Sequence, residues 1–139
     1  MDKILVDYSI GAYGPTLSFI VNSEDILQYL YGLFKGLSRF DYNEISLSEN
    51  DSFVLSNMQD LILKTLTKKK PYEKNLSEIK GENVSCKYIW ALDTEGWYDC
   101  LGLMEGLMQG SGKGHQYLTS EDFDDALVVV SYNEHPEKF

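Results

Sequence analysis

Apolar and polar positions along the first forty residues predict a β-hairpin followed by an amphipathic helix. Residues 3–9 and 16–21 are rich in Ile, Leu and Val, and glycine and proline interrupt the chain between them, as expected of two strands joined by a turn. Asn22 or Ser23 then supplies an N-cap, and acidic side chains follow in the first turn, where they favour the helix dipole. The apolar positions of this helix recur at helical spacing: Ile26, Leu30, Leu33 and Leu37.

The middle of the chain predicts a strand, a second helix and a loop. Residues 44–48 alternate polar and apolar side chains, as a half-buried strand does, and residues 53–56 fit either a return strand or the start of the next helix. The second helix is expected before Pro71, with three lysines at its C-terminal end. Polar residues 71–83 are expected to form a connecting loop. The apolar positions of the second helix are Met58, Leu61, Ile62, Thr65 and Leu66.

The last third of the chain predicts a strand, a third helix and two further strands. Residues 84–92 form the first of these strands, and Asp93 or Thr94 caps the helix that follows. A glycine-rich stretch ends the helix, and residues 116–119 and 126–132 are expected to be strands around an acidic turn. The unbroken valine run in the last strand indicates a central strand that is covered on both faces. The apolar face of the third helix comprises Trp97, Leu101, Met104 and Met108.

The order of these elements predicts a single α+β domain over residues 1–139. We expect a mostly antiparallel sheet with two or three helices packed on it. Segment 32–37, Gly-Leu-Phe-Lys-Gly-Leu, resembles segment 102–107, Gly-Leu-Met-Glu-Gly-Leu, half a chain length later. This internal match predicts a strand–helix–strand–strand duplication with halves 16–56 and 84–132, whose helices pack side by side. A chance match between two apolar helices is the alternative.

Charge is distributed unevenly along the chain. The formal net charge is −10 at pH 7, with 9 acidic and 3 basic side chains in residues 1–60, 3 and 7 in residues 61–90, and 10 and 2 in residues 91–139. Such a field repels nucleic acid and anionic membranes and attracts basic partners, although acidity also serves solubility alone. No apolar run approaches the ~20 residues that span a bilayer, and the N-terminus lacks a signal-peptide pattern. We therefore expect a cytoplasmic protein that binds neither nucleic acid nor membrane.

The sequence contains no recognisable catalytic or metal-binding motif, and we expect no catalytic residue, no metal ligand and no cofactor. The glycine-rich residues 110–114 follow a helix and precede a strand, which reverses the order found in phosphate-binding loops. His115 and His135 are the only histidines, and neither a nucleophile motif nor a metal-ligand spacing accompanies them. A hydrolytic or small-molecule-binding enzyme with His115 in a pocket is one alternative function, and a homo-oligomeric structural or adaptor domain that pairs strand edges is another.

The segments 114–118, Gly-His-Gln-Tyr-Leu, and 126–131, Ala-Leu-Val-Val-Val-Ser, flank the acidic turn. With this layout, the chain resembles small bacterial immunity proteins, which are acidic, cytosolic inhibitors of toxin domains that are often basic nucleases. The resemblance implies that the chain neutralises a basic partner and has no catalysis of its own. Because carboxylates steer a basic partner and aromatic side chains add contact area, we expect the contacts in this region. The candidate contact residues are His115, Tyr117, Glu121, Asp122, Asp124 and Asp125.

Overall fold

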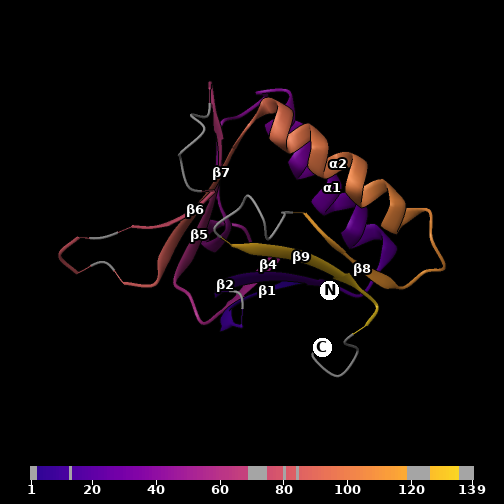
Figure 1. Ribbon diagram of the computed structural model, residues 1–139, viewed down its shortest axis with the longest axis horizontal. Coiled ribbons are helices and arrows are strands. Elements are labelled where there is room, and N and C mark those ends of the chain that lie inside the picture. The colour runs from indigo at the N-terminus through magenta and orange to yellow at the C-terminus, as the bar shows by residue number, and fades with distance from the viewer. Residues whose placement is uncertain are drawn as a thin grey trace.

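Two mixed β-sheets and a pair of helices make up the fold (Figure 1). The predicted α+β class is confirmed, but the sheets are mixed rather than mostly antiparallel, because strands distant in sequence pair in parallel. The computed structural model describes residues 3–12, 14–68, 75–79, 81–83, 85–118 and 126–134.

The first sheet has the strand order β4-β1-β2-β9-β8. The β1–β2 and β8–β9 pairs are antiparallel, whereas β1–β4 and β2–β9 are parallel. The last strand of the chain lies inside this sheet, and its residues from Val128 to Tyr132 are all buried, so the predicted central strand is confirmed. The strands are β1 (Ile4–Gly11), β2 (Gly14–Val21), β4 (Phe53–Ser56), β8 (Gly114–Tyr117) and β9 (Leu127–Tyr132).

The second sheet has the order β3-β5-β7-β6, and it corrects the predicted second helix. The segment expected to be that helix is strand β5, in which Leu61, Leu63 and Thr65 are buried on one face. A short apolar run fits the period of a helix as well as that of a strand. Here the segment is a strand because it pairs with β3 on one side and β7 on the other. The expected loop 71–83 contains short strand β6. The strands are β3 (Glu44–Ser46), β5 (Asp60–Leu66), β6 (Leu76–Glu78) and β7 (Lys87–Asp93).

Helices α1 (Glu24–Ser38) and α2 (Thr94–Met108) lie side by side and close the open side between the two sheets (Figure 1). Each begins at a side-chain cap: Ser23 Oγ accepts a 3.3 Å hydrogen bond from the Ile26 amide, and Asp93 Oδ1 accepts one of 2.8 Å from the Gly96 amide. A one-turn 3-10 helix, η1 (Leu47–Glu49), follows β3. Neither α1 nor α2, in the part of the chain described, is long and apolar enough to cross a membrane.

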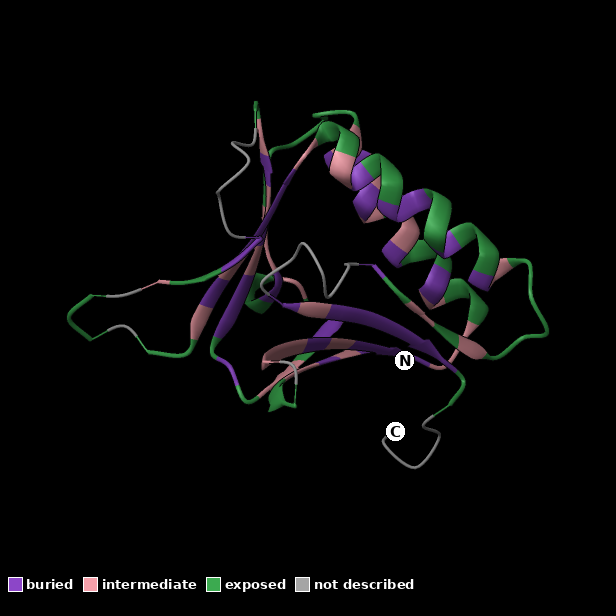
Figure 2. Ribbon diagram, in the orientation of Figure 1, coloured by how far each residue is buried: buried purple, intermediate pink, exposed green. Residues whose placement is uncertain are grey.

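Four aromatic side chains at the centre of the core join both sheets to both helices. All four are fully buried: Phe19 of β2, Phe34 of α1, Trp90 of β7 and Trp97 of α2. The Phe34 and Trp90 rings each contact the other three, and the two indole centroids are 4.7 Å apart. Buried residues of both sheets and of both helices (Figure 2) form one hydrophobic core that includes these four rings. Burial of this aromatic surface fixes the two helices relative to each other, and so fixes the surface that they present to solvent.

The two sheets repeat one pairing pattern. In the first sheet β1 is antiparallel to β2, β2 is parallel to β9, and β9 is antiparallel to β8. In the second sheet β6, β7, β5 and β3 pair in the same way and the same order. Helix α1 follows β2, which pairs with β9 near the end of the chain. Helix α2 follows β7, which pairs with β5 in the first half of the chain. In this pattern β5 is the counterpart of β9, and β4 is an additional edge strand.

Candidate functional site

Strand β8 carries two of the predicted contact residues, His115 and Tyr117, at an edge of the first sheet. His115 pairs with Ser131 of β9, and Tyr117 pairs with Val129. These two positions of β9 alternate with the core residues Val128, Val130 and Tyr132. Both side chains therefore lie on the sheet face that points away from the helices. The other predicted contact residues, Glu121, Asp122, Asp124 and Asp125, lie outside the described residues.

His115 is exposed at the surface of the part of the chain that the structure describes. Its side chain is 53% exposed, and Nδ1 lies 3.0 Å from Glu134 Oε1. The Tyr117 ring packs edge-to-face against the imidazole, with the centroids 5.9 Å apart. The enzyme alternative requires a pocket that converges on His115, whereas the pocket described below lies between the helices, on the other side of the first sheet. Within the described ranges, no group of three or more His, Cys, Asp or Glu side chains could hold a metal ion.

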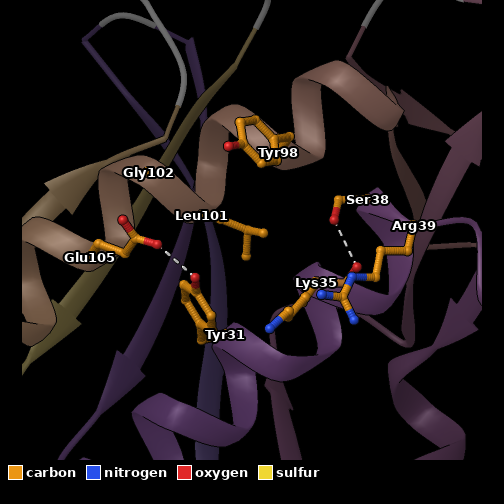
Figure 3. A pocket seen from close by; sticks show the side chains of 8 residues that line it. All are labelled: Tyr31, Lys35, Ser38, Arg39, Tyr98, Leu101, Gly102 and Glu105. Carbon is orange, nitrogen blue, oxygen red and sulfur yellow. Dashed lines mark hydrogen bonds between the residues drawn. The ribbon is translucent and has the colours of Figure 1, made fainter.

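A pocket of about 290 Å³ lies between α1 and α2 and opens to solvent (Figure 3). Helix α1 and its C-cap supply one wall, and α2 supplies the other. We call this the inter-helix pocket. Its lining residues are Tyr31, Lys35, Ser38 and Arg39 on the α1 side, and Tyr98, Leu101, Gly102 and Glu105 on the α2 side.

One hydrogen bond spans the pocket from wall to wall. The Tyr31 hydroxyl donates to Glu105 Oε1 at 2.7 Å. This bond to a carboxylate raises the pKa of Tyr31, because it stabilises the protonated phenol, and partial burial and the charge of Glu105 act in the same direction. The Glu105 carboxylate therefore already has a hydrogen-bond donor, Tyr31, within the pocket.

Two cations also line the pocket, and the charge of Arg39 reaches Tyr31, where it opposes the rise in pKa. Lys35 and Arg39 are one helical turn apart, and their charged groups point into the space between the helices (Figure 3). Among the described residues, no carboxylate lies within 4.0 Å of either cationic group. Arg39 is the only arginine in the sequence. A protein of net charge −10 thus concentrates two of its few cations in one concave site.

The pocket combines matching positions of the two halves. Lys35 and Glu105 hold the same place in the repeated six-residue segments, yet they carry opposite charges. Gly102 likewise matches Gly32, and the helices bearing them pack against each other. Sequence reasoning found the repeat but missed the pocket, although opposite charges at matching helix positions were the signal that could have indicated it.

The solvent-facing side of α2 is acidic and aromatic, and we call it the outward face of α2. Tyr98 is 69% exposed and Leu103 is 39% exposed. Helix α2 contains no lysine or arginine, and a methyl group placed on Gly102 or Gly106 would meet no atom within 4 Å. These glycines therefore leave the helix backbone open to approach from outside. The exposed residues of this face are Glu95, Tyr98, Asp99, Gly102, Leu103, Glu105 and Gly106.

Comparison of the chain with protein-family models, with curated proteins and with solved structures finds no significant match. The inter-helix pocket and the outward face of α2 are therefore the features from which a function can be inferred. The two share Tyr98, Gly102 and Glu105, so a molecule bound at one lies next to the other.

Proposed function

We propose that this chain is a cytoplasmic binding protein that neutralises a basic protein, as an immunity protein inhibits its cognate toxin domain. One observation carries the proposal: the exposed ring of Tyr98 lies among Glu95, Asp99 and Glu105 on a helix without cations. The toxin domain is expected to act on nucleic acid, because such a domain needs a basic surface to hold its substrate.

The helical spacing places these side chains on one surface. Glu95 and Asp99 are one turn apart, and Tyr98 and Glu105 are two turns apart. Lysine and arginine of a partner would meet carboxylates here, and the Tyr98 ring offers them a cation–π face. A tyrosine gives large contact area at low entropic cost, and Tyr98 has most of its surface left to bury. The surface therefore supplies both charge attraction and an aromatic anchor.

The net charge of −10 supports the same kind of partner at long range. Opposite charges steer two proteins together and raise their association rate, most strongly at low ionic strength. The carboxylates of residues 121, 122, 124 and 125, which lie outside the described residues, would add to this field. Steering by the whole chain and docking at the outward face of α2 are separable by experiment.

The oligomer alternative is less favoured by the strand edges. Edge strands β3 and β6 have three residues each, and β4 and β8 have four each. Short edges offer few free backbone groups to a second copy. The enzyme alternative is less favoured because His115 is exposed on the far side of the first sheet from the inter-helix pocket.

The test measures inhibition and association rate with basic proteins encoded beside the gene for this chain. The variant Glu95→Lys/Asp99→Lys/Glu105→Lys reverses the outward face of α2. A matched control, Glu44→Lys/Glu49→Lys/Asp51→Lys, changes the net charge equally at exposed residues outside α2. We expect the native chain to inhibit one such protein, and the α2 variant to associate about tenfold or more slowly at low salt and to lose inhibition.

The control variant is expected to lose less of the association rate and to keep inhibition. Equal losses in both variants would show steering by net charge without docking at α2. A native chain that inhibits none of the neighbouring basic proteins would overturn the proposed function itself. Far-UV circular dichroism of each variant verifies that the fold is retained.

A further inference from the structure

We propose that the inter-helix pocket is a binding site for a small organic anion, namely a carboxylate or phosphate carried on a flat aromatic body. This site goes beyond the proposed function, because its ligand is a free small molecule rather than the basic partner. The anionic group would lie between Lys35 and Arg39, and the aromatic body would lie between Leu101 and Tyr98.

The two cations of the pocket are suited to such a group. Lys35 supplies an ammonium and Arg39 supplies a guanidinium, whose fork of donors matches the oxygens of carboxylate and phosphate. Both groups point into the pocket (Figure 3) and have no ion-pair partner in the described part of the chain. Ser38 is not available as a donor there, since its hydroxyl donates to the Lys35 carbonyl at 2.7 Å.

The middle of the pocket is suited to an aromatic body. Leu101 is buried, with 5% of its surface exposed, and lines the pocket, while the exposed Tyr98 ring stands on the same helix (Figure 3). Gly102 adds no side chain, and the space above it is open to at least 4 Å. The volume of about 290 Å³ lies just below the range of ligand pockets, which span roughly 300–1,000 Å³. It therefore favours a single-ring ligand.

The carboxylate in the pocket sets the orientation of the ligand. Glu105 repels an anion, and one of its oxygens already accepts the Tyr31 hydroxyl. The anionic group of the ligand is thus directed to Lys35 and Arg39, and the body extends toward Glu105. A neutral molecule of the same shape gains only the apolar contacts, so charge is the property that discriminates between ligands.

The experiment follows amide and side-chain NMR signals of the intact chain during titration with four probes. The probes are phenyl phosphate, benzoate, inorganic phosphate and the uncharged benzyl alcohol. We expect the two aromatic anions to shift the Gly102 amide and the Arg39 side-chain signal saturably. Inorganic phosphate should bind more weakly because it lacks the apolar contacts, and benzyl alcohol should bind more weakly because it lacks the charge.

Three substitutions complete the test. Lys35→Gln and Arg39→Gln should each weaken phenyl phosphate binding about tenfold, the effect of losing one charge-assisted hydrogen bond. Lys113→Gln removes an exposed lysine outside the pocket and should leave binding unchanged. Equal effects of all three substitutions, or equal binding of benzyl alcohol and benzoate, would overturn the proposal. Neither result depends on whether a basic protein partner exists, so the two proposals fail independently.

Discussion

Tyr31 and Glu105 connect the two helices at one end of the inter-helix pocket, where the tyrosine hydroxyl donates a 2.7 Å hydrogen bond to the carboxylate (Figure 3). The two residues come from different halves of the chain, and only the packing of α1 against α2 brings them together. The bond orients Glu105 toward α1 and raises the pKa of Tyr31. The titration of Tyr31 therefore reports on the state of the pocket.

Replacing Glu105 with glutamine should lower the pKa of Tyr31 toward the ordinary value near 10. The carboxylate stabilises the protonated phenol, and the neutral amide does so less. Tyr42 is an internal control, because burial is the largest cause of its raised pKa and Glu105 is not among the causes. NMR titration of the tyrosine rings between pH 8 and 13 measures both at once. An unchanged Tyr31 titration in the variant would contradict the assigned hydrogen bond.

The four glycines of the repeated helix segments should respond oppositely to alanine. A methyl group at Gly36 would overlap the Tyr42 ring, whose hydroxyl donates to the Leu33 carbonyl at 2.8 Å. Gly36→Ala should therefore destabilise the fold by about 1–3 kcal/mol. The other three glycines have open space around them, and alanine should stabilise the helix by up to ~1 kcal/mol at each of them: Gly32, Gly102 and Gly106.

Chemical denaturation of each glycine variant measures these differences. If Gly102→Ala or Gly106→Ala stabilises the chain but weakens inhibition of the partner, these glycines allow the partner to approach the backbone of α2 closely. Gly32→Ala is the matched control on α1, where stabilisation without loss of inhibition is expected. A destabilising Gly102→Ala would contradict the open space seen above this residue.

The two central tryptophans should differ in their response to phenylalanine. Trp97 Nε1 donates to the Lys64 carbonyl at 3.1 Å, whereas the buried Trp90 Nε1 has no hydrogen-bond partner among the described residues. Both substitutions remove the same atoms from fully buried sites. Trp97→Phe also leaves a carbonyl without its donor, so it should cost about 1–2 kcal/mol more than Trp90→Phe in the free energy of unfolding. Equal costs in urea denaturation would argue against this difference.

Local chemistry made part of this fold predictable from sequence. Ser23 and Asp93 are helix caps whose hydrogen bonds reach only three residues along the chain, and both helix starts were correctly predicted. Strand β5 was not predictable in this way, because its neighbours on both sides come from distant segments. The apolar pattern around Leu61 and Leu63 fits a helix until those neighbours are known.

Long-range pairing also explains why the pocket was missed. Its walls are separated by about half the chain, so no local window contains both Lys35 and Glu105. The mixed sheets have the same cause, since β2 pairs in parallel with β9 across more than one hundred residues. The repeated segments do identify the two helices that form the pocket, because they contain both of these charged residues. The position of the pocket between the helices, however, depends on how the helices pack.

Alkaline pH should destabilise the chain through Tyr88. Burial, assisted by a hydrogen bond with Tyr8, raises the pKa of Tyr88 to about 12, and the two rings stack with centroids 4.3 Å apart. In the unfolded chain the phenol ionises near pH 10, so the folded state retains a proton that the unfolded state has lost. Stability from this group is complete below pH 10 and falls by about 1.4 kcal/mol per pH unit as the pH rises toward 12.

Denaturation of the native chain and of Tyr88→Phe at pH 8, 10 and 11.5 measures this contribution. Other tyrosines with a raised pKa, Tyr31 and Tyr42, act in the same direction in both proteins, so the difference between the two isolates Tyr88. The native chain should lose more stability between pH 10 and 11.5 than the variant does. Parallel losses in the two proteins would show that Tyr88 ionises in the folded chain as it does in the unfolded chain.

Two exposed tyrosines distinguish the two candidate surfaces for the basic partner. Tyr98 is 69% exposed on the outward face of α2, and Tyr117, a contact predicted from sequence, is 48% exposed beside His115 on the opposite side of the molecule. An aromatic anchor at the centre of an interface contributes about 2 kcal/mol or more. We expect Tyr98→Ala to weaken the partner about thirtyfold, mainly through faster dissociation, and Tyr117→Ala to have little effect. Dissociation kinetics of the two complexes measure this directly, and the reverse order would move the docking site to β8.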